Sequence, residues 1–136
     1  MRLELEAREP ILDPSEEQIR SAILSLGSGP TFASLTMPSG DYVQIAGGRP
    51  WVVLERRQTH PLCHQRAYTL SGRRPYKDGA KLFCTPGPII MREDEWLLQK
   101  QAIEVLLAFA RNDDFPEFTQ WRDIGHAIGL VTQSQP

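Results

Sequence analysis

The sequence has no long hydrophobic run and very few cysteines. No stretch of about 18 apolar residues occurs, so we expect no transmembrane helix. The first ten residues alternate charge with leucine and lack the apolar segment of a secretory signal peptide. Cys63 and Cys84 are the only two cysteines, too few for a disulfide framework. Together these features predict a cytoplasmic protein with reduced thiols and no contact with a membrane.

Motifs for nucleophilic, metal-dependent or phosphate chemistry are also missing. The chain has no G-x-S-x-G, C-x-x-C or H-E-x-x-H pattern, and its Gly47-Gly48 pair has neither the Walker nor the Rossmann spacing. Because strand-like residues stand on both sides of that pair, we interpret it as a chain reversal and not as a phosphate loop. The acids of 93–95 and 113–114 stand in polar sequence, where solvated carboxyls make poor general acids.

Four side chains are candidates for a metal site or a thiol nucleophile: His60, Cys63, His64 and Cys84. Structural zinc usually takes two close pairs of ligands, whereas Cys84 stands alone and His64 falls on the opposite strand face from Cys63. A catalytic thiolate needs a base within hydrogen-bond reach, and His126 is too near the chain end to be held for that task. The pattern favours cysteines that act as small buried hydrophobes. We therefore predict no metal, no cofactor and no catalytic residue, and a protein that is not an enzyme.

The net charge of −2 hides an asymmetry along the chain. Residues 1–48 carry three basic and seven acidic side chains, residues 49–81 carry eight and two, and residues 82–136 carry four and eight. A block of +6 therefore lies between two blocks of −4. This arrangement indicates either a surface that selects partners by charge, or arginines on a solvent-facing sheet that pair with nearby carboxylates.

The first half of the chain reads as a strand, a helix and three further strands. Residues 2–8 alternate apolar and charged side chains, which is typical of an edge strand. Asp13 and Pro14 suit the N-cap and first position of a helix whose apolar stripe reaches Leu26. Strand-like segments then follow in close succession, which predicts an antiparallel meander at 31–37, 42–46 and 51–57.

The second half adds two strands and a long helix. We expect strands at 63–70 and 81–85, and residues 89–91 either extend the sheet or lead into the helix. The acids at 93–95 suit the first turn of that helix, and Asn112 suits its end.

The aromatic residues Phe118 and Trp121 are expected to fold back on the long helix, and residues after 129 to fray. The predicted fold is one α+β domain over 1–136, a single antiparallel sheet of about five to six strands. An N-terminal helix and the long C-terminal helix are expected to pack on this sheet.

Several weak motifs in a fixed order resemble one class of immunity proteins from bacterial polymorphic toxin systems, the Imm1-like proteins. The segments that carry this resemblance span most of the chain: residues 17–26, 32–35, 41–47, 53–57 and 102–114, with Trp121 following. The resemblance implies a cytoplasmic antidote that binds a cognate secreted toxin in one-to-one stoichiometry and blocks its active site or substrate entry. Such toxins include deaminases, nucleases and ADP-ribosyltransferases, often delivered by type VI secretion or contact-dependent systems.

The resemblance carries over no binding positions, so the predicted interface rests on charge. We place the toxin contact on the basic strands and the loop that follows them, where arginines and an aromatic side chain can anchor a partner. The predicted partner-binding residues are Arg56, Arg57, Arg66, Arg73, Arg74 and Tyr76. The alternative is a small nucleic-acid or nucleotide-binding regulator that uses the same 49–81 block, which mixes arginine with Trp51, Tyr68 and Tyr76. The sequence pI of about 5.9 argues against nucleic acid as the partner.

Overall fold

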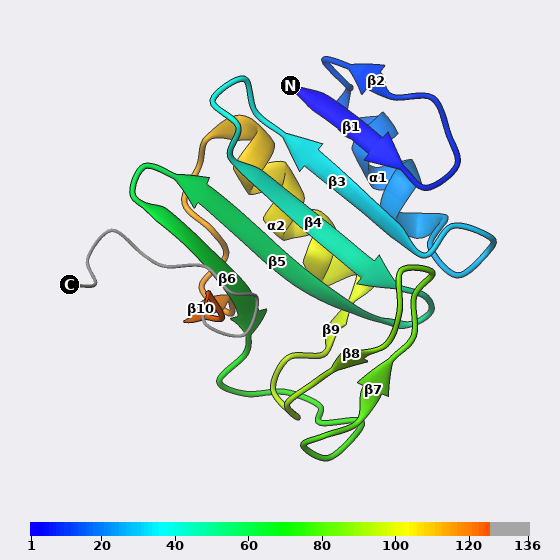
Figure 1. Ribbon diagram of the computed structural model, residues 1–136, viewed down its shortest axis with the longest axis vertical. Helices are drawn as coiled ribbons and strands as arrows, with labels where there is room; N and C mark the ends of the chain where they lie inside the picture. Colours follow the sequence, from blue (N-terminus) through cyan, green and yellow to red (C-terminus); the bar gives the residue numbers. More distant parts are fainter. Residues whose placement is uncertain (126–136) are drawn as a thin grey trace.

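The strand-like segments in the middle of the sequence form the centre of the sheet in the computed structural model, which describes residues 1–125 (Figure 1). β3 (Phe32–Thr36), β4 (Tyr42–Gly47) and β5 (Trp51–Thr59) pair in succession as antiparallel neighbours, as the meander prediction requires. The Gly47-Gly48 pair is confirmed as the reversal between β4 and β5. Gly47 has a φ of 128°, and a Cβ there would lie 2.8 Å from the carbonyl oxygen of Trp51, so this position requires glycine.

Further strands extend the sheet on both sides, in the order β10-β6-β5-β4-β3-β1-β2. β9 pairs with the first two residues of β5, while β6 pairs with its second half. The described residues thus form an eight-stranded main sheet, larger than the five to six strands expected, and the α+β class is confirmed. The added strands are β1 (Arg2–Leu5), β2 (Ile11–Leu12), β6 (Leu62–Tyr68), β9 (Leu97–Leu98) and β10 (Gln120–Asp123).

Two strand predictions were wrong in their placement, and one strand was not predicted. The first strand is not the last in the sheet, because β2 pairs with its residues Arg2 and Leu3. The segment predicted as a fifth strand of the sheet forms β7 (Lys81–Leu82), which pairs outside the main sheet with β8 (Ile89–Ile90). Trp121 belongs to β10, which pairs with β6 and was not predicted as a strand at all.

The N-terminal helix α1 (Glu16–Leu24) begins two residues later than its sequence suggested. Ser15 is the N-cap, and it exchanges hydrogen bonds with Gln18 in a capping box. Asp13 has instead a positive φ of 48°, and its carboxylate accepts a hydrogen bond from the N-terminal amine at 3.0 Å. The prediction of Asp13 as the N-cap was therefore wrong, because the capping box outcompetes a lone acid.

The long helix α2 (Gln99–Arg111) also begins later than predicted. The acids 93–95 lie before it and not in its first turn, because Asp94 and Glu95 bind arginines and Leu97–Leu98 form β9. The predicted end is confirmed. Asn112 adopts the left-handed conformation with a φ of 58°, which is typical of a helix C-cap.

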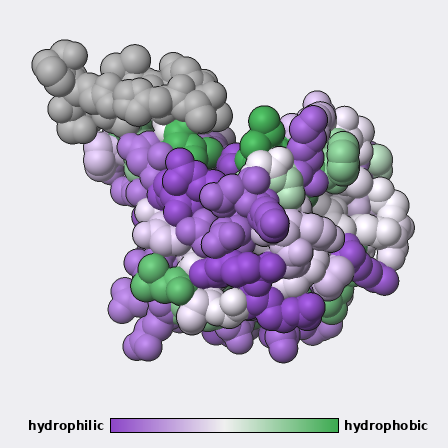
Figure 2. Space-filling model, turned by 90° about the horizontal axis from the view of Figure 1, so that it is seen from below, coloured by the Kyte–Doolittle hydropathy of each residue, from purple (hydrophilic) through white to green (hydrophobic). Residues whose placement is uncertain are grey.

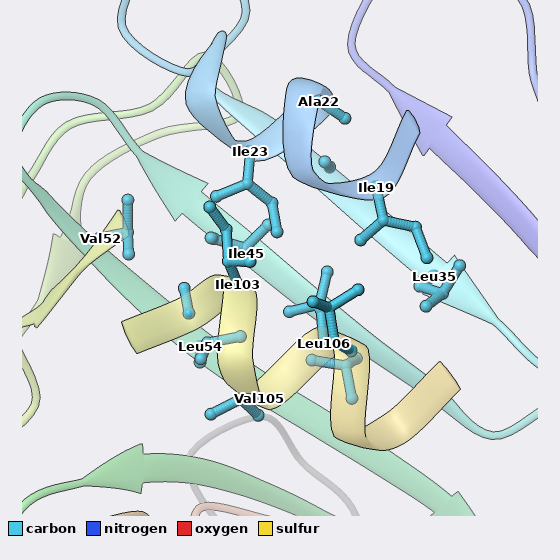
Figure 3. Packing of buried hydrophobic residues seen from close by; sticks show 14 of the residues in the cluster. Ile19, Ala22, Ile23, Leu35, Ile45, Val52, Leu54, Ile103, Val105 and Leu106 are labelled. Atoms are coloured by element: carbon cyan, nitrogen blue, oxygen red, sulfur yellow. The ribbon is translucent and has the colours of Figure 1, made fainter. Parts of the chain in front are cut away.

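Both helices cover the same face of the sheet, and the main core lies between them and the strands (Figures 1 and 3). Every second residue of the central strands points into this core, as the strand alternation predicts. Figure 3 shows the α1 side chains lying against those of α2 and the sheet. The labelled residues are buried members of this cluster: Ile19, Ala22, Ile23, Leu35, Ile45, Val52, Leu54, Ile103, Val105 and Leu106.

Within residues 1–125, no helix lies on the opposite face of the sheet. Instead, the segment that contains β7 and β8 folds over one end of it, at the bottom of Figure 1. A second, smaller core forms there from Val53, Leu82, Met91 and Trp96. In the described part of the chain, none of the helices has the length and apolar character needed to cross a membrane. The predicted fraying after residue 129 concerns residues outside the described range.

Candidate interaction surface and the ion-pair network beside it

The six predicted partner-binding residues do not share one surface. Arg56 and Arg57 are neighbours in β5, so the strand places them on opposite faces of the sheet. The Arg56 guanidinium carbon lies 4.6 Å from the ring centroid of Trp121 and 5.2 Å from that of Phe115. Its Nε donates to Gln65 Oε1 at 2.7 Å. Arg56 therefore packs at the margin of the main core, and Arg57 faces the other way.

Arg66 is held inside the molecule by two acids. Its Nε donates to Glu55 Oε2 at 2.9 Å, and its Nη1 donates to Glu95 Oε1 at 3.2 Å. A further bond from Nη1 reaches the carbonyl oxygen of Ile90 at 3.1 Å. Only 14% of the Arg66 side chain is exposed. Its positive charge is therefore paired with carboxylates of the protein itself and is not available to a partner.

Arg122 continues this arrangement from the neighbouring strand β10. Its Nη1 donates to Glu95 Oε2 at 2.9 Å, and its Nη2 donates to Asp94 Oδ2 at 2.8 Å. The guanidinium carbon also lies 4.3 Å from the ring centroid of Tyr68. The hydrogen bonds from Arg122 lower the pKa of Asp94 and raise the pKa of Arg122 itself. Both groups are therefore held in their charged forms.

His64 and Gln44 complete the set around Glu55. The His64 Nε2 atom lies 3.0 Å from Glu55 Oε1, and Gln44 Nε2 donates to the same oxygen at 3.2 Å. Burial alone would raise the pKa of Glu55, but the bond to His64 and the charge of Arg66 outweigh it, so the pKa lies below its ordinary value. The other ring nitrogen of His64, Nδ1, is buried and has no hydrogen-bond partner among the described residues.

We call these side chains the ion-pair network: Glu55, His64, Arg66, Asp94, Glu95 and Arg122. It joins three strands, β5, β6 and β10, to the segment that precedes α2. Its carboxylates already accept bonds from protein donors, so the network serves as a cross-link of the fold. Sequence reasoning missed it, because 93–95 had been assigned to a helix and the pairing of β10 with β6 was not foreseen.

Arg73, Arg74 and Tyr76 all lie in the loop after β6, but they have different contacts. Arg74 donates from Nη1 to the hydroxyl of Thr69 and from Nη2 to its carbonyl oxygen, each at 2.8 Å, so this arginine closes the loop. Arg73 is exposed, and its guanidinium carbon lies 5.5 Å from the ring centroid of Trp51. Tyr76 lies against Trp96 with ring centroids 4.7 Å apart, and half of the residue is exposed.

Arg73 and Tyr76 belong to a surface that the sequence only partly revealed. We call it the aromatic–basic surface: Trp51, Arg73, Tyr76, Lys81 and Phe83. A groove of about 400 Å³ runs between the β4–β5 reversal and β7, lined by Trp51, Tyr76, Lys81 and Phe83 among others. Phe83 is 73% exposed, unusually much for a phenylalanine. Figure 2 looks at the end of the molecule that carries β7 and β8, and shows hydrophobic side chains as separate patches in a mostly hydrophilic surface.

The four candidate metal ligands do not converge in the described structure. His60 is exposed at the turn between β5 and β6, and His64 is buried against Glu55. The Cys63 thiol lies 3.7 Å from Gln58 Oε1, while the Cys84 thiol donates to the carbonyl of Gly87 at 3.1 Å. Within residues 1–125 no group of three or more histidine, cysteine, aspartate or glutamate side chains is placed to hold a metal ion. His126 lies outside the described residues.

No protein-family model matches this chain, and no curated protein matches it either.

Proposed function

We propose that this protein is an immunity-type inhibitor, which binds a cognate secreted bacterial toxin domain and blocks its active site or substrate entry. It acts in the cytoplasm and performs no chemistry itself. The observation that carries the proposal is the aromatic–basic surface, where an exposed Phe83 and a half-exposed Tyr76 surround a groove between cationic side chains. Large aromatic side chains with arginine beside them are the residues that dominate protein–protein binding energy.

The scaffold beneath this surface suits an inhibitor. Trp51 begins β5, and its neighbour Val53 is 2% exposed in the second core. Tyr76 rests on the buried Trp96, and Arg74 fixes the loop that carries Arg73. The anchors are therefore held before the partner arrives, which lowers the entropic cost of binding. We infer a partner surface that presents carboxylates around an apolar centre, complementary to Arg73 and Lys81.

The test is co-expression with a toxin domain encoded beside this protein. The native chain should form a one-to-one complex and restore growth. Phe83→Ala should raise the dissociation constant of the complex by roughly 10- to 100-fold, the range of an interface hot spot. Arg73→Glu should raise the dissociation constant further. Arg8→Glu, an equal charge reversal at an exposed arginine in the β1–β2 connection, should leave the dissociation constant unchanged. If both surface variants protect cells as well as the native protein, this surface is not the interface.

Nucleic acid remains the second candidate, because exposed Phe83 and Tyr76 beside cations would also suit base stacking. Four of the eight basic side chains in the 49–81 block are already engaged within the fold. Arg49 donates to the carbonyl oxygen of Leu24, and Arg56, Arg66 and Arg74 have the partners described above. Few cations remain for phosphate contacts, which favours a protein partner. Salt-dependent binding of a single-stranded oligonucleotide, lost in Phe83→Ala, would reverse this preference.

A further inference from the structure

A separate cavity of about 520 Å³ lies on the helix-free face of the sheet. Its floor consists of outward-facing residues of β3, β4 and β5 in register. Phe32, Ala46 and Val53 form an apolar row, and Ser34, Gln44 and Glu55 form a polar row beside it. Its roof is the connection between β7 and β8 together with the first residue of β8: Cys84, Pro86, Gly87, Pro88 and Ile89. The volume falls in the range of small-molecule sites in proteins.

The roof is fastened on both sides, so the cavity is a feature of the folded chain. The backbone N–H of Thr85 donates to the Thr31 hydroxyl at 2.9 Å, and the two hydroxyl oxygens lie 2.9 Å apart. Glu6 anchors Thr31 in turn, since its carboxylate accepts from the Thr31 amide at 2.7 Å. On the other side, the pairing of β7 with β8 holds Ile89 against the second core.

The polar groups of the floor offer hydrogen-bond acceptors. Gln44 Nε2 donates to Glu55 Oε1, so the amide carbonyl of Gln44 is turned away from the carboxylate. This carbonyl oxygen has no hydrogen-bond partner within residues 1–125, and Gln44 lines the cavity. The carboxylate of Glu55 already accepts from Gln44, His64 and Arg66, so it acts on a ligand through its charge.

The charge around the floor is negative. Among the described residues that line the cavity, Glu55 is the one charged side chain. Glu6 adds a further carboxylate at the roof. Burial raises the pKa of the Cys84 thiol, the hydrogen bond to Gly87 lowers it, and the charges of Glu6 and Glu55 raise it further. Apolar walls over a carbonyl acceptor and a carboxylate are complementary to a cation with an apolar body.

We propose that this cavity binds a small organic cation, a protonated amine or amidinium on an aromatic or branched aliphatic body. The apolar body lies against Phe32, Ala46 and Ile89, and the cationic head donates to the Gln44 carbonyl in the field of Glu55. The site is distinct from the aromatic–basic surface and has the opposite charge preference. It stands whether or not the protein inhibits a toxin.

The test uses a fragment library with equal numbers of cationic, neutral and anionic members, screened by amide chemical shifts of the full chain. Cations should predominate among fragments that shift the amides of Ser34, Gln44 and Ala46. The best cationic fragment should bind at least roughly tenfold tighter than its isosteric carboxylate, as one charged hydrogen bond allows. Ser34→Phe fills the cavity and should abolish binding. Thr36→Phe places the same ring two residues along the same face of β3, outside the cavity lining, and should not.

A second variant addresses the acceptor. Gln44→Leu keeps the size of the side chain and removes the carbonyl, so it should reduce the preference for cations over neutral isosteres by roughly tenfold. Native-like amide dispersion and an unchanged melting temperature in each variant show that the fold is intact. The proposal fails if no fragment shifts the floor amides, if anions bind as well as cations, or if Ser34→Phe and Thr36→Phe bind the cation equally.

Discussion

Glu55 accepts a hydrogen bond from His64, which is not its direct neighbour in the sheet. The register places Arg66 opposite Glu55 and places His64 opposite Arg57, so the imidazole reaches Glu55 diagonally, with Nε2 3.0 Å from Oε1. One carboxylate thus receives a direct and a diagonal partner from β6. It also receives Gln44 from β4 on its other side. At this point, charge and hydrogen bonds hold together the face of the sheet that the described helices leave uncovered.

Acidification should lower the free energy of unfolding, because it protonates Glu55. The pKa of Glu55 in the folded protein lies below its ordinary 4.5, so the folded state binds fewer protons than the unfolded chain. Its contribution is complete above about 4.5 and is lost as the pH falls through the folded-state pKa. Asp94 acts in the same direction below its ordinary 3.8, because Arg122 holds it ionised. Urea unfolding at about pH 7 and about pH 3 measures the loss.

The Glu55→Gln variant supplies the control for that experiment. It should be less stable than the native protein near neutral pH, because Arg66 and His64 lose their charged acceptor. It should then lose less stability on acidification, since the titrating group is gone. An identical pH dependence in the two proteins would show that Glu55 does not contribute to acid unfolding.

Replacement by alanine should lower the free energy of unfolding much more at Glu95 than at Glu93, two residues earlier. Glu95 is 2% exposed and binds both Arg66 and Arg122, so Glu95→Ala removes one charged acceptor from each of these two partly buried guanidiniums. We expect a loss of about 3 kcal/mol in the free energy of unfolding. Glu93 is exposed, and Glu93→Ala should change stability by less than about 0.5 kcal/mol. Equal effects in chemical denaturation would contradict the structural role assigned to Glu95.

A second pair of substitutions, at two adjacent residues of α1, tests the packing of α1 against α2. Ile23 is fully buried between α1, α2 and the sheet, so Ile23→Ala should cost about 3 kcal/mol through lost burial and the cavity it leaves (Figure 3). Leu24, the next residue, is 46% exposed, and Leu24→Ala should cost under about 1 kcal/mol. Thermal melting of both variants decides the point, and a Leu24 effect as large as that of Ile23 would refute this packing.

The apolar periodicity of the sequence was enough to predict the α+β class and the central meander. In β5, Val52 and Leu54 face the main core, while Val53 faces the second core, as strand alternation requires. The first residues of the two helices were predicted less well. The N-cap of α1 is Ser15 and not the predicted Asp13. Residues 93–95 lie before α2, where Glu95 binds arginines from β6 and β10.

The candidate sites depended on contacts that join distant parts of the chain. The sequence showed that 49–81 is basic, but it could not show that Arg56 packs on Trp121 or that Arg66 and Arg74 are engaged within the fold. Nor could it place Phe83 beside Trp51, or the 84–89 connection over Gln44.

Local periodicity by itself determined the central strands, the presence of two helices and most of the core of this protein, because burial of alternate side chains is a short-range pattern. The tertiary structure alone decided which charges remain free and where the hollows lie. Those properties depend on strand register and on the pairing of segments far apart in the sequence, and no local pattern records them.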